Sequence, residues 1–226
     1  QPLLPAKDVI ALIVKDLSEA KALLAHEQNE SLKTSDRRYR FNYHAVNALL
    51  ARVYSYAGDS TNAIASAEEV IKKSGLELSS NNQDDPILFS ECICALYKHH
   101  LTEALSQFWA DGDKYTTQYF IRSERFNKYF EVSGNLKEDM RTKTAAFYEH
   151  SSAKTALSRK YSINSQEAIP LIRLPEMYYI LAENTSDLTK AAKYLNAVRN
   201  KRGYSRSVNV QFTNAATQQA AVDKEF

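Results

Sequence analysis

The chain has 226 residues, of which 44% are hydrophobic. A chain of this length can bury about 70% of the surface that it exposes when unfolded. Its 29 basic and 27 acidic side chains give a net charge of +2, which excludes a strong overall field for nucleic acid or an anionic membrane. The chain contains only 5 glycines and 5 prolines, and this low content argues against a collagen-like, a sandwich-rich or a disordered protein. No apolar run reaches the roughly eighteen residues of a transmembrane helix.

The first predicted element is an amphipathic helix over residues 8–25. Its apolar residues recur at helical steps on one face: Val9, Leu12, Ile13, Leu17, Ala20 and Leu24. The following residues 26–40 are polar and include Arg37, Arg38 and Arg40. Such a stretch is typical of a solvated connector, and a patch for a phosphate or an acidic partner is the alternative.

Residues 41–75 predict two helices joined by a short turn. Apolar residues recur at three- and four-residue steps on both sides of the turn, where Ser60 can cap the second helix. Gly75 stands where a glycine commonly ends a helix. Because the turn is short, the helices must pack antiparallel. The spacing fits a tetratricopeptide unit of about 34 residues through Leu50, Ala51, Tyr54, Ala63 and Ala67.

A second helical pair is predicted over residues 169–203. When Gly75 is aligned with Gly203, Ala63 meets Ala191 and the order of helix, polar turn, helix and glycine repeats. Pro175 then falls in the first turn of a helix, where a missing N–H has no cost. The two pairs predict a single helical domain interrupted by a large insertion.

The insertion is predicted to cover residues 79–165 and to carry the ligand face. Residues 79–86 have the composition of a surface loop, and residues 87–97 are apolar and tolerate a β-strand. Weak alternation over residues 143–150 and 155–162 predicts a β-hairpin.

Aromatic residues are the most unusual feature of the composition, with 14 Tyr, 9 Phe and 1 Trp. Such rings suit carbohydrate recognition, because a flat sugar face stacks on a ring while its hydroxyls meet polar groups. Five residues in the insertion are predicted to face a ligand: Trp109, Tyr115, Tyr119, Arg122 and Asn127. Packing beneath a loop is the alternative for the three rings. Three other rings repeat at helical steps and are predicted core residues: Phe126, Tyr129 and Phe130.

The sequence holds no recognisable catalytic motif. It lacks a glycine-rich phosphate loop, G-x-S-x-G, H-E-x-x-H and paired C-x-x-C motifs. Glu176 and Glu183 share one face of a predicted helix, where carboxylates belong to an interface or to solvent far more often than to an active site. Cys92 and Cys94 are expected to be buried structural thiols. We therefore expect no enzymatic activity, no metal and no cofactor.

Four short stretches carry a combined signal: LLARVY at 49–54 with YAGD at 56–59, DMR at 139–141, IRLPEMY at 172–178 with LAE at 181–183, and LNAVRNKRG at 195–203. Together, and in the same order, they resemble helix and turn motifs of the SusD/RagB family. Pro175 departs from the family, which has a small residue there. The resemblance implies that the sequence corresponds to the middle and rear of a member.

The resemblance implies a mainly α-helical, tetratricopeptide-like scaffold with loop-rich insertions and a small β-hairpin. It also implies a non-catalytic protein that binds oligosaccharide and delivers it to a TonB-dependent, SusC-like outer-membrane porin. Such proteins are surface-exposed lipoproteins of the outer membrane, held by an N-terminal lipid that lies outside this sequence. The family motifs assign no ligand residue, because its binding aromatic residues lie in variable loops.

Two other functional classes remain open from the residues. A generic tetratricopeptide scaffold would grip a peptide in its concave groove and would not need the aromatic insertion. An all-helical glycoside hydrolase would need two carboxylates across a cleft, roughly 5–10 Å apart. Sugar binding, peptide binding and hydrolysis products separate the three hypotheses.

Overall fold

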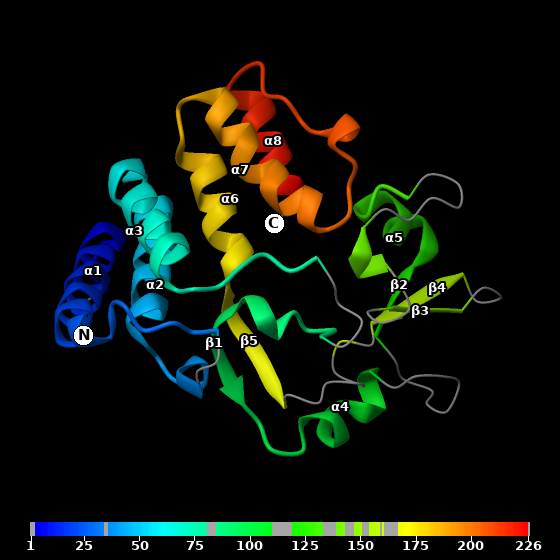
Figure 1. Cartoon of the computed structure of the whole chain (residues 1–226), viewed down its shortest axis with the longest axis horizontal. Helices are drawn as coiled ribbons and strands as arrows, with labels where there is room; N and C mark the ends of the chain where they lie inside the picture. The colour runs from blue at the N-terminus through cyan, green and yellow to red at the C-terminus, as the bar shows by residue number, and fades with distance from the viewer. Residues whose placement is uncertain are drawn as a thin grey trace.

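The computed structural model describes residues 3–33, 36–80, 85–109, 119–132, 139–142, 147–150, 154–158, 160 and 167–225, with the backbone alone described at 106–109, 148–150 and 225. Six helices form a row in which each contacts a neighbour (Figure 1): α1 (Ala6–Leu23), α2 (Tyr43–Tyr56), α3 (Ser60–Lys73), α6 (Leu174–Asn184), α7 (Leu188–Lys201) and α8 (Ala215–Glu225). Two shorter helices are α4 (Leu101–Trp109) and α5 (Ser123–Tyr129). Single 3-10 turns occupy Ala25–Glu27, Asp36–Tyr39, Phe89–Glu91, Met140–Thr142 and Arg206–Val208. The mainly helical fold class is confirmed.

Helices α2 and α3 form an antiparallel hairpin, as the spacing predicts. The Asn42 side chain caps α2 by accepting a hydrogen bond from the Ala45 N–H at 2.9 Å. The cap of α3 is Asp59, which accepts from the Asn62 N–H at 3.1 Å, so the prediction of Ser60 as the cap is wrong. The hydroxyl of Ser60 instead donates to Asn184 on α6.

The second hairpin, α6 and α7, packs beside the first through contacts between α6 and α3. Pro175 lies in the first turn of α6, as predicted. The first residues of the predicted pair 169–203 are not helical, because Ala168–Arg173 form strand β5, which pairs antiparallel with β1 (Cys92–Tyr97). Pairing with a distant strand satisfies the backbone groups that a longer helix would have satisfied locally.

The main core lies between the two hairpins and the β1–β5 sheet. Ala51, Ala63 and Ala67 are all completely buried and allow the close helix approach that their size predicts. The thiols of Cys92 and Cys94 are also buried and unbridged, as predicted, and burial raises the pKa of Cys92 to about 12.

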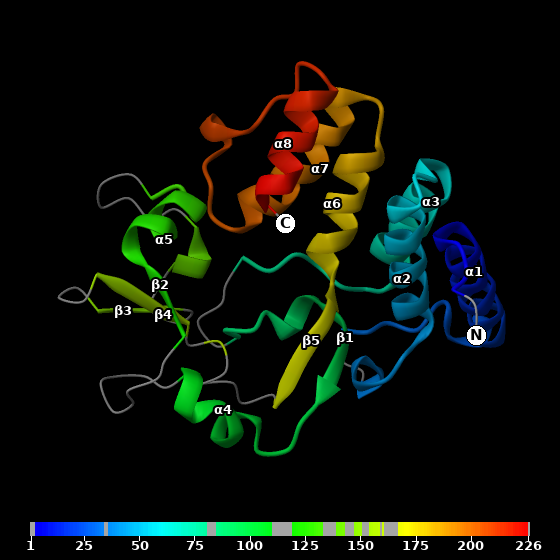
Figure 2. The same cartoon turned by 180° about the vertical axis from the view of Figure 1, so that it is seen from behind.

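A second sheet combines β2 (Phe120–Arg122), β4 (Thr155–Ser158) and β3 (Phe147–His150) in that order, all antiparallel. The β3–β4 pairing confirms the predicted hairpin, whereas β2 is an additional strand. This sheet and α5 lie at the end of the molecule opposite α1, as the front and back views both show (Figures 1 and 2).

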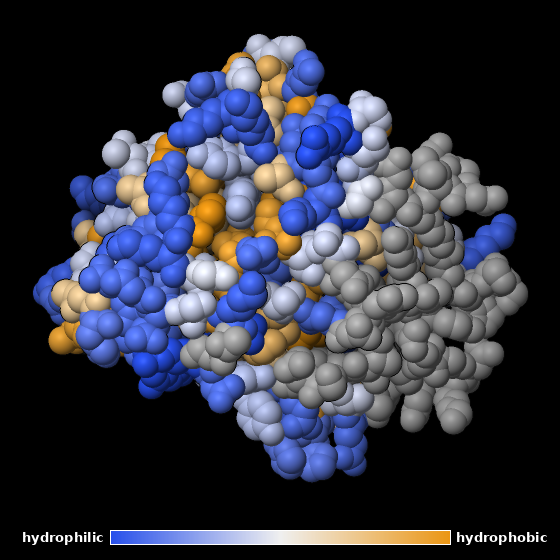
Figure 3. Space-filling model, viewed as in Figure 1, coloured by the Kyte–Doolittle hydropathy of each residue, from blue (hydrophilic) through white to orange (hydrophobic). Residues whose placement is uncertain are grey.

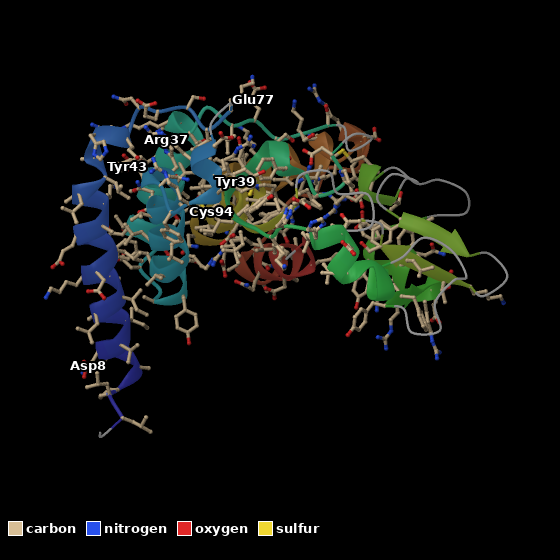
Figure 4. All side chains as sticks on the ribbon, turned by 90° about the horizontal axis from the view of Figure 1, so that it is seen from below. Asp8, Arg37, Tyr39, Tyr43, Glu77 and Cys94 are labelled. Carbon is tan, nitrogen blue, oxygen red and sulfur yellow. The ribbon has the colours of Figure 1, made fainter. Side chains whose placement is uncertain are left out.

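The arginine-containing segment after α1 is a connection whose arginines are anchored to the fold, which argues against the alternative of an anion patch. Arg37 and Arg40 form ion pairs with Glu27, whose side chain is buried. Arg38 donates to the Phe89 carbonyl at 2.8 Å and lies over the Phe89 ring. Figure 4 shows this segment, with Arg37 and Tyr39, between α1 and the β1 region. The arginines therefore stabilise a connection and do not form an open anion patch.

A buried ion pair joins the end of α7 to the start of β1. Arg202 donates from both terminal nitrogens to the two oxygens of Glu91, at 2.8 and 2.7 Å, and their side chains are 3% and 0% exposed. The Ser79 N–H donates to the same carboxylate at 2.5 Å, and the Met140 N–H donates to the Arg202 carbonyl at 2.6 Å. Four segments of the chain thus converge on this pair.

Replacement Arg202→Met is expected to lower the free energy of unfolding by about 3–5 kcal/mol, because it leaves the Glu91 carboxylate buried without its partner. The double variant Glu91→Gln/Arg202→Met is expected to recover part of this loss, since no buried charge remains unpaired. Urea denaturation measures both. The control Lys15→Gln alters an exposed pair with Glu19 at 4.0 Å and should change stability by less than about 1 kcal/mol. A loss that small for Arg202→Met would contradict the role of the pair.

Gly75 and Gly58 provide a matched pair for a second stability test. Both have positive φ, at +71° and +78°. A Cβ added at Gly75 would collide with the Ser31 side chain, whereas a Cβ added at Gly58 would have no heavy atom of another residue within 4 Å. Gly58→Ala is expected to lower the free energy of unfolding by about 1–2 kcal/mol, because alanine is strained in a left-handed backbone conformation. Gly75→Ala is expected to lower it further, because of the added collision with Ser31. Adding Ser31→Gly to Gly75→Ala should remove the difference. Equal thermal denaturation midpoints for the two single variants would show that the Ser31 contact has no energetic weight.

Candidate functional site

The five residues predicted to face a ligand are only partly within the described chain. Trp109 ends α4 and its side chain lies outside the described residues, as does the whole of Tyr115. Tyr119 stands immediately before β2 with 61% of its surface exposed. Arg122 ends β2 and Asn127 lies in α5, both exposed. The structure therefore brings three of the five predicted residues into one small unit.

The unit consists of β2, α5 and the strands beside them. Phe120 pairs with Leu157 of β4, and the Ser123 N–H donates to the Lys154 carbonyl at 3.0 Å, which fixes where the strand ends and the helix starts. Phe126 is 1% exposed and holds α5 on the sheet through an edge contact with the Phe147 ring, with centroids 5.0 Å apart. This aromatic packing leaves the opposite side of β2 and α5 open.

A hollow of about 730 Å³ lies on the open side of this unit. Its described lining residues come from β2 and α5: Phe120, Ile121, Arg122, Glu124, Arg125 and Tyr129. Phe120 and Tyr129 expose 57% and 62% of their surfaces, so two ring faces are accessible beside two guanidinium groups. Such a combination can stack on a flat ligand and bind its polar or anionic substituents.

The prediction that Tyr129 belongs to the core is wrong. Helical spacing places Tyr129 near Phe126 and Phe130, but α5 has only 7 residues and covers a small sheet. The rings of Phe126, Phe130 and Phe147 fill that contact among themselves, at centroid distances of 4.9 to 5.6 Å. Tyr129 is left outside.

Sequence reasoning also missed Phe120 and Arg125 as lining residues. Within β2 the exposed Phe120 and Arg122 alternate with the half-buried Ile121, a period of two that signals a strand with one open face. The alternation appears only in burial, because Phe120 and Ile121 are both apolar, so the sequence carries no signal that could have identified Phe120. The Arg122–Arg125 spacing becomes informative only once a helix is known to start at Ser123.

The two glutamates that could imitate a catalytic pair serve the helix interface. Glu176 accepts hydrogen bonds from the Arg52 guanidinium at 2.6 and 2.9 Å, and Glu183 accepts from the Ser55 hydroxyl at 3.2 Å. Both contacts join α6 to α2. In the described part of the chain, no group of three or more His, Cys, Asp or Glu side chains is placed to hold a metal ion. Nor does any described helix combine the length and apolar character needed to cross a bilayer.

A second hollow of about 570 Å³ lies over α6 and α7, beneath the chain that follows α3. Figure 3 shows hydrophobic residues gathered in this region and bordered by hydrophilic ones. Its walls include Ile71, Leu78 and Tyr178, with Lys201 and Arg206 at its polar side.

Comparison with solved structures identifies the fold. A SusD superfamily protein from Bacteroides thetaiotaomicron superposes with a TM-score of 0.70 at 23% identity, over 96% of this chain and 51% of that one. A SusD-like carbohydrate binding protein from Bacteroides vulgatus superposes with a TM-score of 0.69 at 18% identity, over 100% of this chain and 48% of that one. A SusD superfamily protein from Bacteroides fragilis superposes with a TM-score of 0.71 at 17% identity, over 99% of this chain and 59% of that one. This chain has the SusD-like fold.

The chain spans about half the length of these SusD-like structures. Neither the protein-family models nor the curated proteins contain a match to the sequence. The likeness is therefore carried by the arrangement of the backbone.

The four stretches that resemble SusD/RagB motifs lie in two contacting pairs within the SusD-like fold. The first and third stretches meet through the Arg52–Glu176 ion pair between α2 and α6. The second and fourth meet through the Met140 N–H and the Arg202 carbonyl. Asp139 is buried and forms an ion pair with Arg141, which shapes the turn. The motif residues thus form contacts that hold the scaffold together, and Arg141 and Arg199 also contact Phe130 and Glu131, which directly follow α5.

The aromatic residues of α5 are expected to divide into a structural one and a ligand-facing one. Phe126→Ala should cost about 3–5 kcal/mol of stability, because it removes a fully buried ring. Tyr129→Ala should change stability by less than about 0.5 kcal/mol, because the ring is exposed. Chemical denaturation of both variants tests the assignment. A comparable loss in Tyr129→Ala would return that ring to the core.

Proposed function

We propose that this chain is a non-catalytic glycan-binding protein and that the hollow beside β2 and α5 holds the sugar. The observation that carries the proposal is the pair of exposed rings, Phe120 and Tyr129, beside Arg122 and Arg125 on one open face. Sugar rings stack on such aromatic faces, and guanidinium groups donate to oxygen atoms. A SusD-like neighbour is itself a carbohydrate binding protein, which supports the same function here.

In this proposal residues 79–165 are an insertion between the helical pairs 41–75 and 169–203, and the insertion carries the ligand face. Tyr119 and Asn127 extend the surface around the hollow, with Asn127 as a partner for sugar hydroxyls, and Trp109 and Tyr115 keep the ligand-binding role that the sequence predicts for them. The complete protein is a surface lipoprotein of the outer membrane that delivers oligosaccharide to a TonB-dependent, SusC-like porin. The resemblance in sequence and the SusD-like fold support this part of the proposal.

A tetratricopeptide-type interaction scaffold is the second candidate. The apolar hollow over α6 and α7 favours it, because an exposed apolar surface with a polar border is typical of a protein-binding face. This candidate predicts peptide or protein binding at α6 and α7 and leaves the rings of β2 and α5 without a role.

Calorimetry with a panel of neutral and acidic oligosaccharides tests glycan binding. At least one sugar is expected to bind, and Tyr129→Ala is expected to weaken its binding about tenfold through the loss of a stacking ring. Trp109→Ala tests in the same way an aromatic residue that the sequence predicts to face the ligand. The matched control is Tyr56→Ala, which removes a tyrosine ring that is 82% exposed at the end of α2 and should leave affinity unchanged.

The possible results separate the site from the function. Sugar binding that neither Tyr129→Ala nor Trp109→Ala weakens would refute the site and keep the function. Failure of every glycan to bind would refute the function and favour the scaffold alternative.

A further inference from the structure

Arg122 and Arg125 differ from most arginines of the described chain in having no local partner. Arg52, Arg141, Arg199 and Arg202 each form an ion pair with a carboxylate. Neither Arg122 nor Arg125 makes a hydrogen bond or ion pair with its side chain anywhere in the described residues, and both are exposed beside the hollow. Their donors are available to a ligand.

The surroundings of these two arginines reinforce their positive charge. Lys128 lies one turn beyond Arg125 on α5, and Lys154 adjoins the end of β2, where its carbonyl accepts from the Ser123 N–H. Both lysines are exposed. The one carboxylate among the described lining residues is Glu124.

The next carboxylate along the chain does not offset this charge. Glu131 forms ion pairs with Arg199 and Lys224, and hydrogen bonds from these cations hold its pKa below the usual range against the effect of burial. The described residues of β2, α5 and the adjoining Lys154 thus carry four cations, Arg122, Arg125, Lys128 and Lys154, and one carboxylate, Glu124, in a chain whose net charge is only +2. A concentration of one sign of charge at a hollow attracts ligands of the opposite sign.

We propose that the hollow selects anionic oligosaccharides, in which uronate carboxylates or sulfate esters bind to Arg122 and Arg125 while sugar rings stack on Phe120 and Tyr129. A planar guanidinium donates two parallel hydrogen bonds to either group, and the negative charge of these groups strengthens the bonds in a way that a neutral sugar cannot. The volume of about 730 Å³ is that of a small-ligand site. The inference rests on the proposed glycan-binding function and specifies its substrate class.

The test compares three tetrasaccharides by calorimetry: a galacturonate oligomer, a sulfated galactose oligomer and a neutral galactose oligomer. At least one anionic ligand is expected to bind ten or more times more tightly than the neutral one, and its affinity should fall several-fold between 50 and 300 mM NaCl, values chosen to span the Debye screening range. The two anionic ligands distinguish carboxylate from sulfate recognition.

The double variant Arg122→Gln/Arg125→Gln is expected to bind the preferred anionic ligand at least ten times more weakly, which corresponds to about 1.4 kcal/mol. Its thermal denaturation midpoint should not change, because both side chains are exposed. The matched control Arg206→Gln removes an exposed arginine at the second hollow and should leave affinity unchanged. Loss of affinity in the control but not in the double variant would overturn the assignment of the site.

Equal affinity for neutral and anionic tetrasaccharides would overturn the inference and leave glycan binding intact. Loss of neutral and anionic binding alike in the double variant would also overturn it, since the arginines would then not discriminate charge. Absence of binding by all three ligands and by the wider glycan panel would overturn the proposed function itself, together with the inference.

Discussion

The buried pair of Glu91 and Arg202 is the interaction on which the arrangement of the chain depends. Burying two charges has a large desolvation cost, which is offset only when their geometry is good and their other donors and acceptors are satisfied. Here the pair is doubly hydrogen-bonded, and Ser79 donates its N–H to Glu91 and accepts from Arg202, while the Arg202 Nε–H has no acceptor among the described residues. The end of α7, the turn before β1, the chain at Ser79 and the turn at Met140 are held together because each contributes to this cluster.

How far the sequence predicts this fold depends on how local each signal is. The hairpin of α2 and α3 is predictable because its apolar spacing, its turn and Gly75 lie within one short stretch. Strand β5 is not, because the same apolar residues also fit a helix and their partner β1 lies far earlier in the chain. Pairing of β2 with β4 is missed for the same reason. Local periodicity identifies regular structure, but it does not choose between a helix and a strand whose partner is distant.

The candidate site shows the same limit in a sharper form. Composition indicates the aromatic-rich segment, and Arg122, one of the residues that it predicts to face a ligand, lines the hollow. Composition does not show which rings are exposed, because Phe126 and Tyr129 have similar neighbours in sequence. They differ in packing: Phe126 is buried against the sheet, and Tyr129 is exposed. One ring covers the sheet and the other has no apolar surface left to cover. Exposure of a ring in a short helix is therefore a property of its packing partner, which the sequence of the helix does not contain.

Charge is distributed in a way that agrees with this division between scaffold and ligand face. In the scaffold, Arg52 binds Glu176 between helices and Arg202 binds Glu91 in the core, so each guanidinium meets a carboxylate supplied by a distant part of the chain. Such contacts stabilise one arrangement and leave little net field. Beside β2 and α5, exposed arginines keep their hydration and have no folding contact to lose. Charges that serve folding must be paired within the protein, whereas charges that serve binding must remain unpaired until a ligand arrives. The SusD-like fold allows both because its core contacts and its open face are built from different segments.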